Sequence, residues 1–216
     1  MKTGIFSCVI FISGIIMAAP EKIDTNGLLK VSIFFSSLCP GSRKFITQQL
    51  YPNYEGLKHR IVIEWVLYQE DTGFDDVKFY CMHGSKECDF NRYIVCALNQ
   101  GRGQDRDVKF INCIMHEYDF RNCLAKFGYR WSKFRNCIDQ KGYSILSHHV
   151  AKVKKIKLRR LSYIPAIIYD DQDYENIDFL SLRKFRQTVC SKLVSPLPNI
   201  CHKKVEKPII KGLVLK

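Results

Sequence analysis

Beyond residue 19, the sequence lacks an apolar run long enough to cross a membrane. It also lacks a glycine-rich phosphate loop, a credible Ser-His-Asp arrangement and a recognition motif for nucleic acid. None of its asparagines stands in an Asn-x-Ser/Thr acceptor site for N-linked sugar. These absences argue against a membrane-spanning domain, a P-loop nucleotide-binding protein, a serine hydrolase and a protein that binds a specific nucleic acid.

The first 19 residues have the layout of a secretory signal peptide. Lys2 supplies the positive start, and the apolar run "IFSCVIFISGIIMAA" ends in small residues, which places cleavage near Ala18 or Ala19. An uncleaved anchor is the alternative, but the run is short for a membrane span. We therefore expect a soluble mature chain in the secretory pathway, without a transmembrane anchor, beginning with a short N-terminal segment over 20–27.

The cysteine count is odd once the signal is removed. Ten cysteines become nine when Cys8 leaves, and in an oxidising compartment most of them should pair. Cys39 stands alone far upstream, which favours it as the unpaired thiol, although counting alone leaves another cysteine possible. The other eight are predicted to form structural disulfides: Cys81, Cys88, Cys96, Cys113, Cys123, Cys137, Cys190 and Cys201.

Cys39 lies where a predicted strand turns into a predicted helix. "LLKVSIFF" (28–35) is apolar and rich in β-branched and aromatic residues, and "SRKFITQQL" (42–50) has apolar residues at helical spacing. Pro40 suits the first turn of a helix. A helix start favours the thiolate form of Cys39. A second cysteine three residues on would complete a redox motif, but Ser42 occupies that position.

The remaining elements predict an α/β, thioredoxin-like fold with a disulfide-braced helical insertion. A second strand is expected within 59–70, then an insertion over 73–160, then strands at 166–170 and 174–177 and a helix from about Asp178, its N-cap, to 193. Pro165 would be the cis-proline that faces the active cysteine, or simply a proline at a strand entry. The predicted domain covers 28–201, followed by a basic tail over 202–216.

The most specific motif is "CMHGSKECDFNRYIVC" (81–96), a C-x-H-G-x-x-E-C-x-x-N-x-x-x-x-C pattern. It resembles the signature of the gamma-interferon-inducible lysosomal thiol reductase (GILT) family. "SLCPGSR" looks like that family's CxxC segment and "YIPAIIYDD" is similar to its cis-proline strand. The resemblance runs from about Val31 to Cys201.

This resemblance implies reduction of disulfides in protein substrates through Cys39, Ser42 being the position of the missing second cysteine. No cofactor is expected, but an external thiol such as glutathione or cysteine would have to complete the cycle. Ser42 could donate a hydrogen bond to the Cys39 sulfur. The alternative is a secreted binding protein on a retired enzyme scaffold.

A zinc site built from Cys81, His83, Cys88 and Cys96 is a rival interpretation of the signature, disfavoured by ligand spacing and by the secretory setting. We expect His83 and Gly84 to form a turn, with Glu87 and Asn91 making local hydrogen bonds and no catalytic role.

The mature chain has a net charge near +12, from 33 basic and 21 acidic residues after Lys2 is removed. Six basic residues in "AKVKKIKLRRL" could bind a polyanion or an anionic surface, or could be a solvated helix face: Lys152, Lys154, Lys155, Lys157, Arg159 and Arg160. His148 and His149 beside them could respond to endosomal pH or be ordinary surface residues. The missing glycosylation site favours an extracellular over a lysosomal destination.

Overall fold

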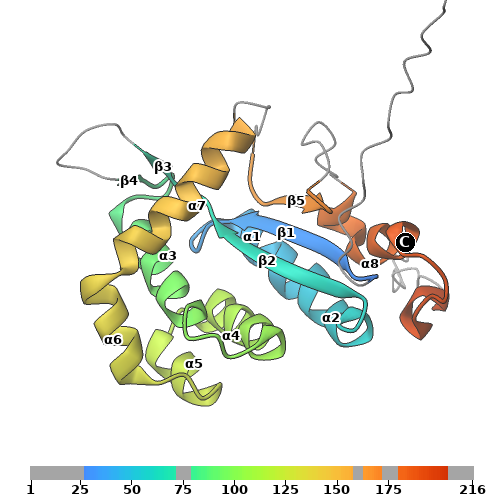
Figure 1. Ribbon diagram of the computed structural model, residues 1–216, viewed down its shortest axis with the longest axis horizontal. Helices are drawn as coiled ribbons and strands as arrows, with labels where there is room; N and C mark the ends of the chain where they lie inside the picture. Colours follow the sequence, from blue (N-terminus) through green and yellow to red (C-terminus); the bar gives the residue numbers. More distant parts are fainter. Residues whose placement is uncertain (1–26, 72–78, 158–162, 172–179, 204–216) are drawn as a thin grey trace, which may run out of the picture.

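The computed structural model describes residues 27–71, 79–157, 163–171 and 180–203. In this part of the chain the central sheet has three strands in the order β2-β1-β5 (Figure 1). β1 (Leu29–Phe35) pairs in parallel with β2 (Ile61–Leu67) and antiparallel with β5 (Ala166–Tyr169). Both faces of β1 are covered, because Val31, Ile33 and Phe35 belong to one buried cluster and Phe34 to another, and this explains its nearly continuous apolar sequence.

A long helical segment connects β1 to β2. It consists of α1 (Pro40–Phe45), a π-helical stretch η1 (Ile46–Leu50) and α2 (Tyr51–Leu57). The sequence predicted the helix start at Cys39 and Pro40 correctly, but the predicted helix ended at Leu50, before α2. Pro52 falls within the first two residues of α2, and the wider π-helical hydrogen bonding just before it lets the chain stay helical past a residue that has no N–H.

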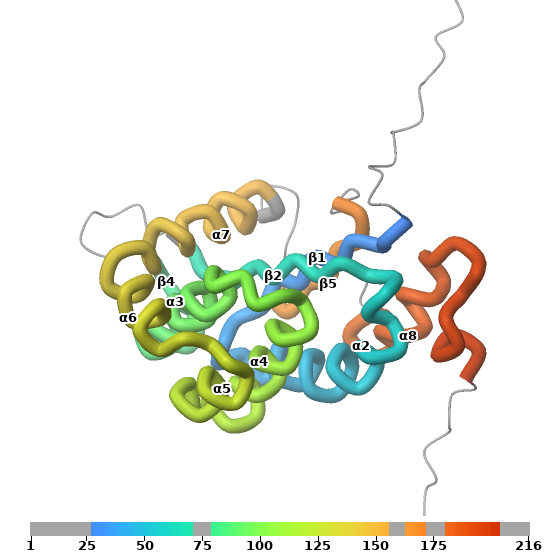
Figure 2. Tube along the Cα trace, turned by 60° about the horizontal axis from the view of Figure 1, so that its bottom comes forward, coloured from blue at the N-terminus to red at the C-terminus, as the bar shows by residue number. Residues whose placement is uncertain are grey.

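The insertion is helical, as predicted, and lies beside one end of the sheet (Figures 1 and 2). A small hairpin of β3 (Glu70–Asp71) and β4 (Phe79–Tyr80) leads into it. Five helices follow: α3 (Ser85–Leu98), α4 (Gln104–Glu117), α5 (Phe120–Lys126), α6 (Trp131–Gln140) and α7 (Gly142–Lys157). None of the described helices combines the length and hydrophobicity that a membrane span requires.

One hydrophobic core joins the sheet and the insertion. Val31, Ile33 and Phe35 of β1 belong to the same buried cluster as Ile94 of α3 and Phe110 of α4. A smaller cluster on the other face of the sheet includes Phe34, Val66 and Ala166, together with Val153 of α7. The insertion therefore packs as part of the domain rather than as a separate unit. This arrangement is the α/β, thioredoxin-like fold with a helical insertion that the sequence predicted.

Four disulfides join eight cysteines in the described residues: Cys81–Cys88, Cys96–Cys137, Cys113–Cys123 and Cys190–Cys201. The first three lie within the insertion, and the fourth joins the last α-helix, α8 (Ser181–Lys192), to the segment that follows it. Cys81, Cys88 and Cys96 are thus bonded to sulfur, which leaves none of them as a thiolate ligand for zinc.

The last helix, α8, spans Ser181–Lys192 and begins later than predicted. Leu180 rather than Asp178 occupies the N-cap position. Ser181 fixes this start, because its buried hydroxyl lies 2.6 Å from the Tyr169 hydroxyl of β5. Asp178 itself and the strand predicted at 174–177 lie outside the described residues.

Candidate active site

Cys39 is the free cysteine of the described residues and occupies the N-cap position of α1. Its backbone is extended, with φ −68° and ψ 120°, and Pro40 follows as the first helical residue. The first helical hydrogen bond runs from the Arg43 N–H to the Cys39 carbonyl. Only 7% of Cys39 is exposed, so neighbouring atoms cover most of this residue at the helix start.

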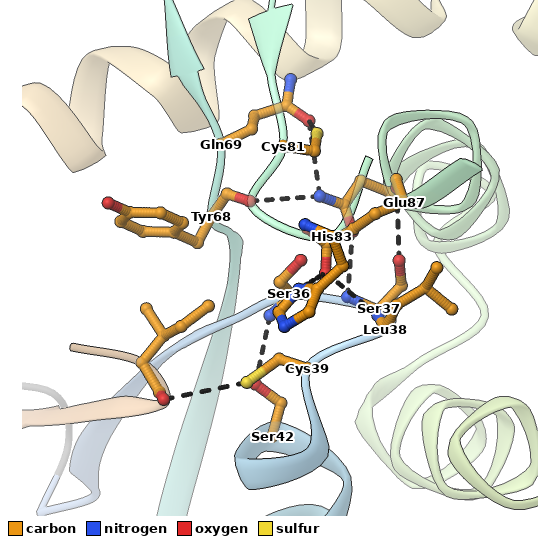
Figure 3. Close-up of polar contacts among 12 residues, drawn as sticks. Ser36, Ser37, Leu38, Cys39, Ser42, Tyr68, Gln69, Cys81, His83 and Glu87 are labelled. Carbon is orange, nitrogen blue, oxygen red and sulfur yellow. Dashed lines mark hydrogen bonds and ion pairs between the residues drawn. The ribbon is translucent and has the colours of Figure 1, made fainter. Parts of the chain in front are cut away.

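Residues far away in sequence face this sulfur. The Cys39 thiol donates to the Ile164 carbonyl at an Sγ–O distance of 3.8 Å, the dashed line that leaves the Cys39 sulfur in Figure 3. The Ile164–Pro165 peptide is cis. Gly41 completes the contact, since a Cβ atom at this position would lie 3.1 Å from Pro165 Cδ and 3.7 Å from Cys39 Sγ. Pro165, which the sequence offered as a cis-proline facing Cys39 or as a simple strand-entry proline, thus has a cis peptide and lies beside the free cysteine.

Ser42 is fully buried one turn into the helix. Its hydroxyl oxygen accepts the Ser36 N–H at 3.2 Å. This contact uses the acceptor side of the hydroxyl, so donation by Ser42 to a Cys39 thiolate stays a prediction. Ser42 thus ties the end of β1 to the first turn of α1. The nearby Ser36 hydroxyl is buried without a hydrogen-bond partner among the described residues.

Two side chains of α3 bind the turn that precedes Cys39. Asn91 Oδ1 accepts the Ser37 N–H at 3.0 Å, and Glu87 Oε1 accepts the Leu38 N–H at 3.2 Å. We expected Glu87 and Asn91 to make local hydrogen bonds, and that prediction was too narrow, because these contacts span about fifty residues of chain. Their four-residue spacing places both on one face of α3, a signal already present in the sequence.

His83 closes this group of contacts. Its Nδ1 lies 2.7 Å from Glu87 Oε1, and its backbone N–H donates to Glu87 Oε2 at 3.1 Å (Figure 3). The His83 side chain is 32% exposed, whereas that of Glu87 is 1% exposed. The imidazole therefore lies between the buried carboxylate and solvent.

The sequence of residues 30–141 matches the family described as gamma interferon inducible lysosomal thiol reductase (GILT). This match covers more than half of the chain. The chain belongs to the GILT family.

Relatives within this family are distant in sequence. A GILT-like protein of Anopheles gambiae is 27% identical over 192 residues, covering 79% of each chain. The gamma-interferon-inducible lysosomal thiol reductase of Carassius auratus is 26% identical, with coverage of 82% of this chain and 73% of that protein. Among solved structures, the oxidoreductase DsbA from Xylella fastidiosa aligns with a TM-score of 0.47 at 14% identity, over 76% of this chain and 85% of that one.

The described lysines of the basic run, Lys152, Lys154 and Lys155, lie in the second half of α7. Lys152 is paired with Glu64 of β2, and burial lowers the pKa of this lysine. Lys154 and Lys155 have exposed side chains. Arg159 and Arg160, and the side chain of Lys157, lie outside what the structure describes, so binding of a polyanion by this run stays a prediction.

The two neighbouring histidines of α7 differ in environment. His148 is exposed, whereas His149 is half-buried and its Nδ1 accepts the Leu67 N–H at 3.1 Å. Burial lowers the pKa of His149 to about 4, and the adjacent His148 adds to this shift. His149 is thus a neutral hydrogen-bond acceptor that joins α7 to the end of β2.

Cys113, Glu117 and Cys123 bring possible metal-binding atoms close together in the described part of this GILT-family protein. The two sulfurs are bonded to each other, so they offer no thiolate to a metal ion.

Proposed function

We propose that this chain is a thiol–disulfide oxidoreductase of the GILT type that acts on disulfide-containing proteins through one cysteine, Cys39. The observation that carries the proposal is the position of the free Cys39 thiol, beside the Ile164 carbonyl and Pro165 at the start of a helix. Membership of a thiol reductase family supports this chemistry.

The first step needs only Cys39. Its thiolate attacks one sulfur of a substrate disulfide, a mixed disulfide forms, and the other substrate sulfur leaves as a thiolate that takes up a proton. In a dithiol enzyme a second cysteine would then attack the Cys39 sulfur. Ser42 stands there instead, and its hydroxyl cannot form a disulfide.

The second step therefore requires an external thiol such as glutathione or free cysteine. One thiol attacks the Cys39 sulfur and releases the reduced substrate, and a second frees Cys39 while forming the oxidised small thiol. One substrate disulfide and two external thiols thus become two substrate thiols and one small-molecule disulfide. No electron carrier other than sulfur enters this balance.

The proposed location is the secretory pathway. Four disulfides in the described residues fit an oxidising compartment, as does the signal peptide proposed for residues 1–19. Of the two destinations, the absence of an N-glycosylation acceptor favours extracellular over lysosomal.

The deciding experiment compares wild type, Cys39→Ala and Ser42→Cys in a disulfide-reduction assay at pH 5 and pH 7, with and without glutathione. We expect wild type to form a Cys39 adduct but to turn over only with glutathione, and Ser42→Cys to turn over with a dithiol reductant. Cys39→Ala should be inactive throughout. Release of reduced substrate by pre-reduced wild type to the same extent as by pre-reduced Ser42→Cys, in a single round without external thiol, would show that the cycle is not blocked at Ser42.

A second function is favoured by the 7% exposure of Cys39 together with the exposed lysines of α7. It is a secreted binding protein that recognises a polyanion or an acidic protein on an inactive GILT scaffold. If Cys39 resists alkylation in every sample and Ser42→Cys stays inactive, this binding function replaces the enzymatic one.

A further inference from the structure

The turn before Cys39 presents two consecutive backbone N–H groups to α3. Asn91 Oδ1 binds the N–H of Ser37 and Glu87 Oε1 binds the N–H of Leu38. A third contact runs the other way, from the Ser37 hydroxyl to the Glu87 backbone carbonyl at 3.3 Å. Three hydrogen bonds thus attach two residues of the turn to one helix of the insertion (Figure 3).

The two acceptors are themselves held in place. Glu87 Oε2 accepts the His83 N–H, and Asn91 Nδ2 donates to the Tyr68 carbonyl at 3.1 Å, just beyond the end of β2. Glu87 and Asn91 are both buried, so neither can exchange these partners for water without exposing itself. The Cys81–Cys88 disulfide further ties the His83 segment to α3.

From these contacts we infer that Glu87 and Asn91 are positioning residues for Cys39. Glu87 and Asn91 fix the backbone that precedes Cys39, and Ser42 and the first turn of α1 fix the backbone that follows it. Together these contacts hold the Cys39 Sγ against the Ile164 carbonyl. Attack on a disulfide depends on the direction of approach, so a shift of about 1 Å in the sulfur lowers the rate. The inference rests on the function proposed above.

A purely structural role for the same hydrogen bonds is the competing explanation. Loss of either acceptor leaves a buried N–H unpaired, which destabilises any protein whatever its chemistry. The two explanations predict different effects when these hydrogen bonds are lost. If they position Cys39, the rate of disulfide exchange falls in molecules that remain folded. If they are only structural, the folded fraction falls and the rate per folded molecule does not change.

The experiment compares Glu87→Ala, Glu87→Gln and Asn91→Ala with the control Asp89→Ala. Asp89 is an acidic residue on the same helix, and its half-exposed carboxylate pairs with Arg92. The rate of adduct formation between Cys39 and oxidised glutathione is measured per folded molecule, with thermal unfolding recorded in parallel. We expect a loss of about tenfold for each alanine variant, corresponding to one hydrogen bond, partial recovery in Glu87→Gln and little change in Asp89→Ala.

Rescue by Glu87→Gln is informative because the amide oxygen can still accept the Leu38 N–H, although the amide nitrogen cannot accept the His83 N–H. A second readout uses the Ser42→Cys background, where the reduction potential of the new disulfide should shift with Glu87→Ala and not with Asp89→Ala. If the alanine variants do not fold, amide exchange in wild type decides: the Ser37 and Leu38 N–H groups should be protected, and exchange as fast as in an open loop overturns the inference.

The outcomes separate the two proposals. If wild type forms adducts and all folded variants form them at the same rate, positioning is wrong while the proposed function stands. If wild-type Cys39 forms no adduct at all, the proposed function is wrong and the positioning role falls with it.

Discussion

At the scale of single residues, the close packing around the Cys39 sulfur should control how easily a substrate disulfide reaches it. Cys39 is 7% exposed, and its neighbours are the Ile164 carbonyl on one side and the helix start on the other. Gly41 is the second residue of α1, and a Cβ atom at this position would lie only 3.4 Å from the Ile164 oxygen. Small changes here should alter reactivity without altering the fold.

Gly41→Ala is a direct test of that statement. The added Cβ would lie 3.1 Å from Pro165 Cδ, so Pro165 or the helix start must move by a few tenths of an ångström. Alanine also favours a helix over glycine by up to about 1 kcal/mol. We therefore expect an unchanged or slightly higher melting temperature together with slower adduct formation at Cys39. Lys44→Ala, an exposed change on the same helix, is the control, and equal rates for all three proteins would contradict the prediction.

At the scale of elements, α7 is attached to the sheet by polar as well as apolar contacts. Val153 packs in the smaller core, Lys152 pairs with Glu64 of β2, and His149 accepts the Leu67 N–H. The last contact exists only while Nδ1 carries no proton. Its loss would affect the end of β2, next to Tyr68, whose carbonyl binds Asn91.

Acid should therefore destabilise the folded state by protonating His149. The pKa of this residue is about 4 in the folded state and 6.5 in its absence, so the folded state binds fewer protons between these values. The free energy of unfolding is unaffected by protonation of His149 above about pH 6.5. It decreases by up to about 3 kcal/mol as the pH falls towards 4.

Urea unfolding at pH 7, 5.5 and 4 measures this loss. His149→Asn keeps an acceptor near the Nδ1 position but does not titrate, so its stability should fall less steeply with pH than that of wild type. His148→Asn, at the exposed neighbour, should follow wild type. Parallel curves for wild type and His149→Asn would show that His149 is not the responsible group.

Elements with strong local signals could be predicted from the sequence, and those that depend on tertiary contacts could not. β1 was evident from its β-branched and aromatic run, and Cys39 as the free thiol followed from an odd count and its isolation. The helix continuing through Pro52 was missed because a proline normally ends a helix, and the π-helical stretch before it leaves no local signature.

The site shows the same division. Cys39, Ser42 and Pro165 were recognisable from the chain, but the hydrogen bonds of Glu87 and Asn91 to the turn before Cys39 were not. Such contacts join segments about fifty residues apart, and nothing in the local sequence says which helix face meets which turn. The pairing of the eight bonded cysteines was open for the same reason.

At the scale of the whole molecule, the insertion and the sheet form one body. Residues of β1, α3 and α4 share a single buried cluster, and α3 contacts the turn that precedes Cys39. The insertion therefore contacts the candidate active site through α3. Through Val153 of α7 it also covers the other face of the sheet. Its disulfides stabilise the helices that hold Cys39, even though they take no part in the proposed exchange.

The whole molecule also carries a large positive charge. If the lysines of α7 form a binding surface, they should contribute more to heparin binding than basic residues elsewhere. A chain with a net charge of +13 will bind heparin to some extent wherever its lysines lie, so retention alone says nothing about a site. We compare Lys154→Glu/Lys155→Glu on α7 with Lys133→Glu/Arg135→Glu on α6, since all four side chains are exposed and each pair of changes lowers the net charge by the same amount.

If the basic run is a binding surface, the α7 pair should elute from a heparin column at clearly lower salt than the α6 pair, because only the former removes charges next to each other within a cluster. Screening by salt makes the difference largest at low ionic strength. Equal shifts for the two pairs would mean that heparin responds to net charge only and that Lys154 and Lys155 belong to a solvated helix face. In that case the binding-protein alternative would lose its main support, while the chemistry proposed for Cys39 would be unaffected.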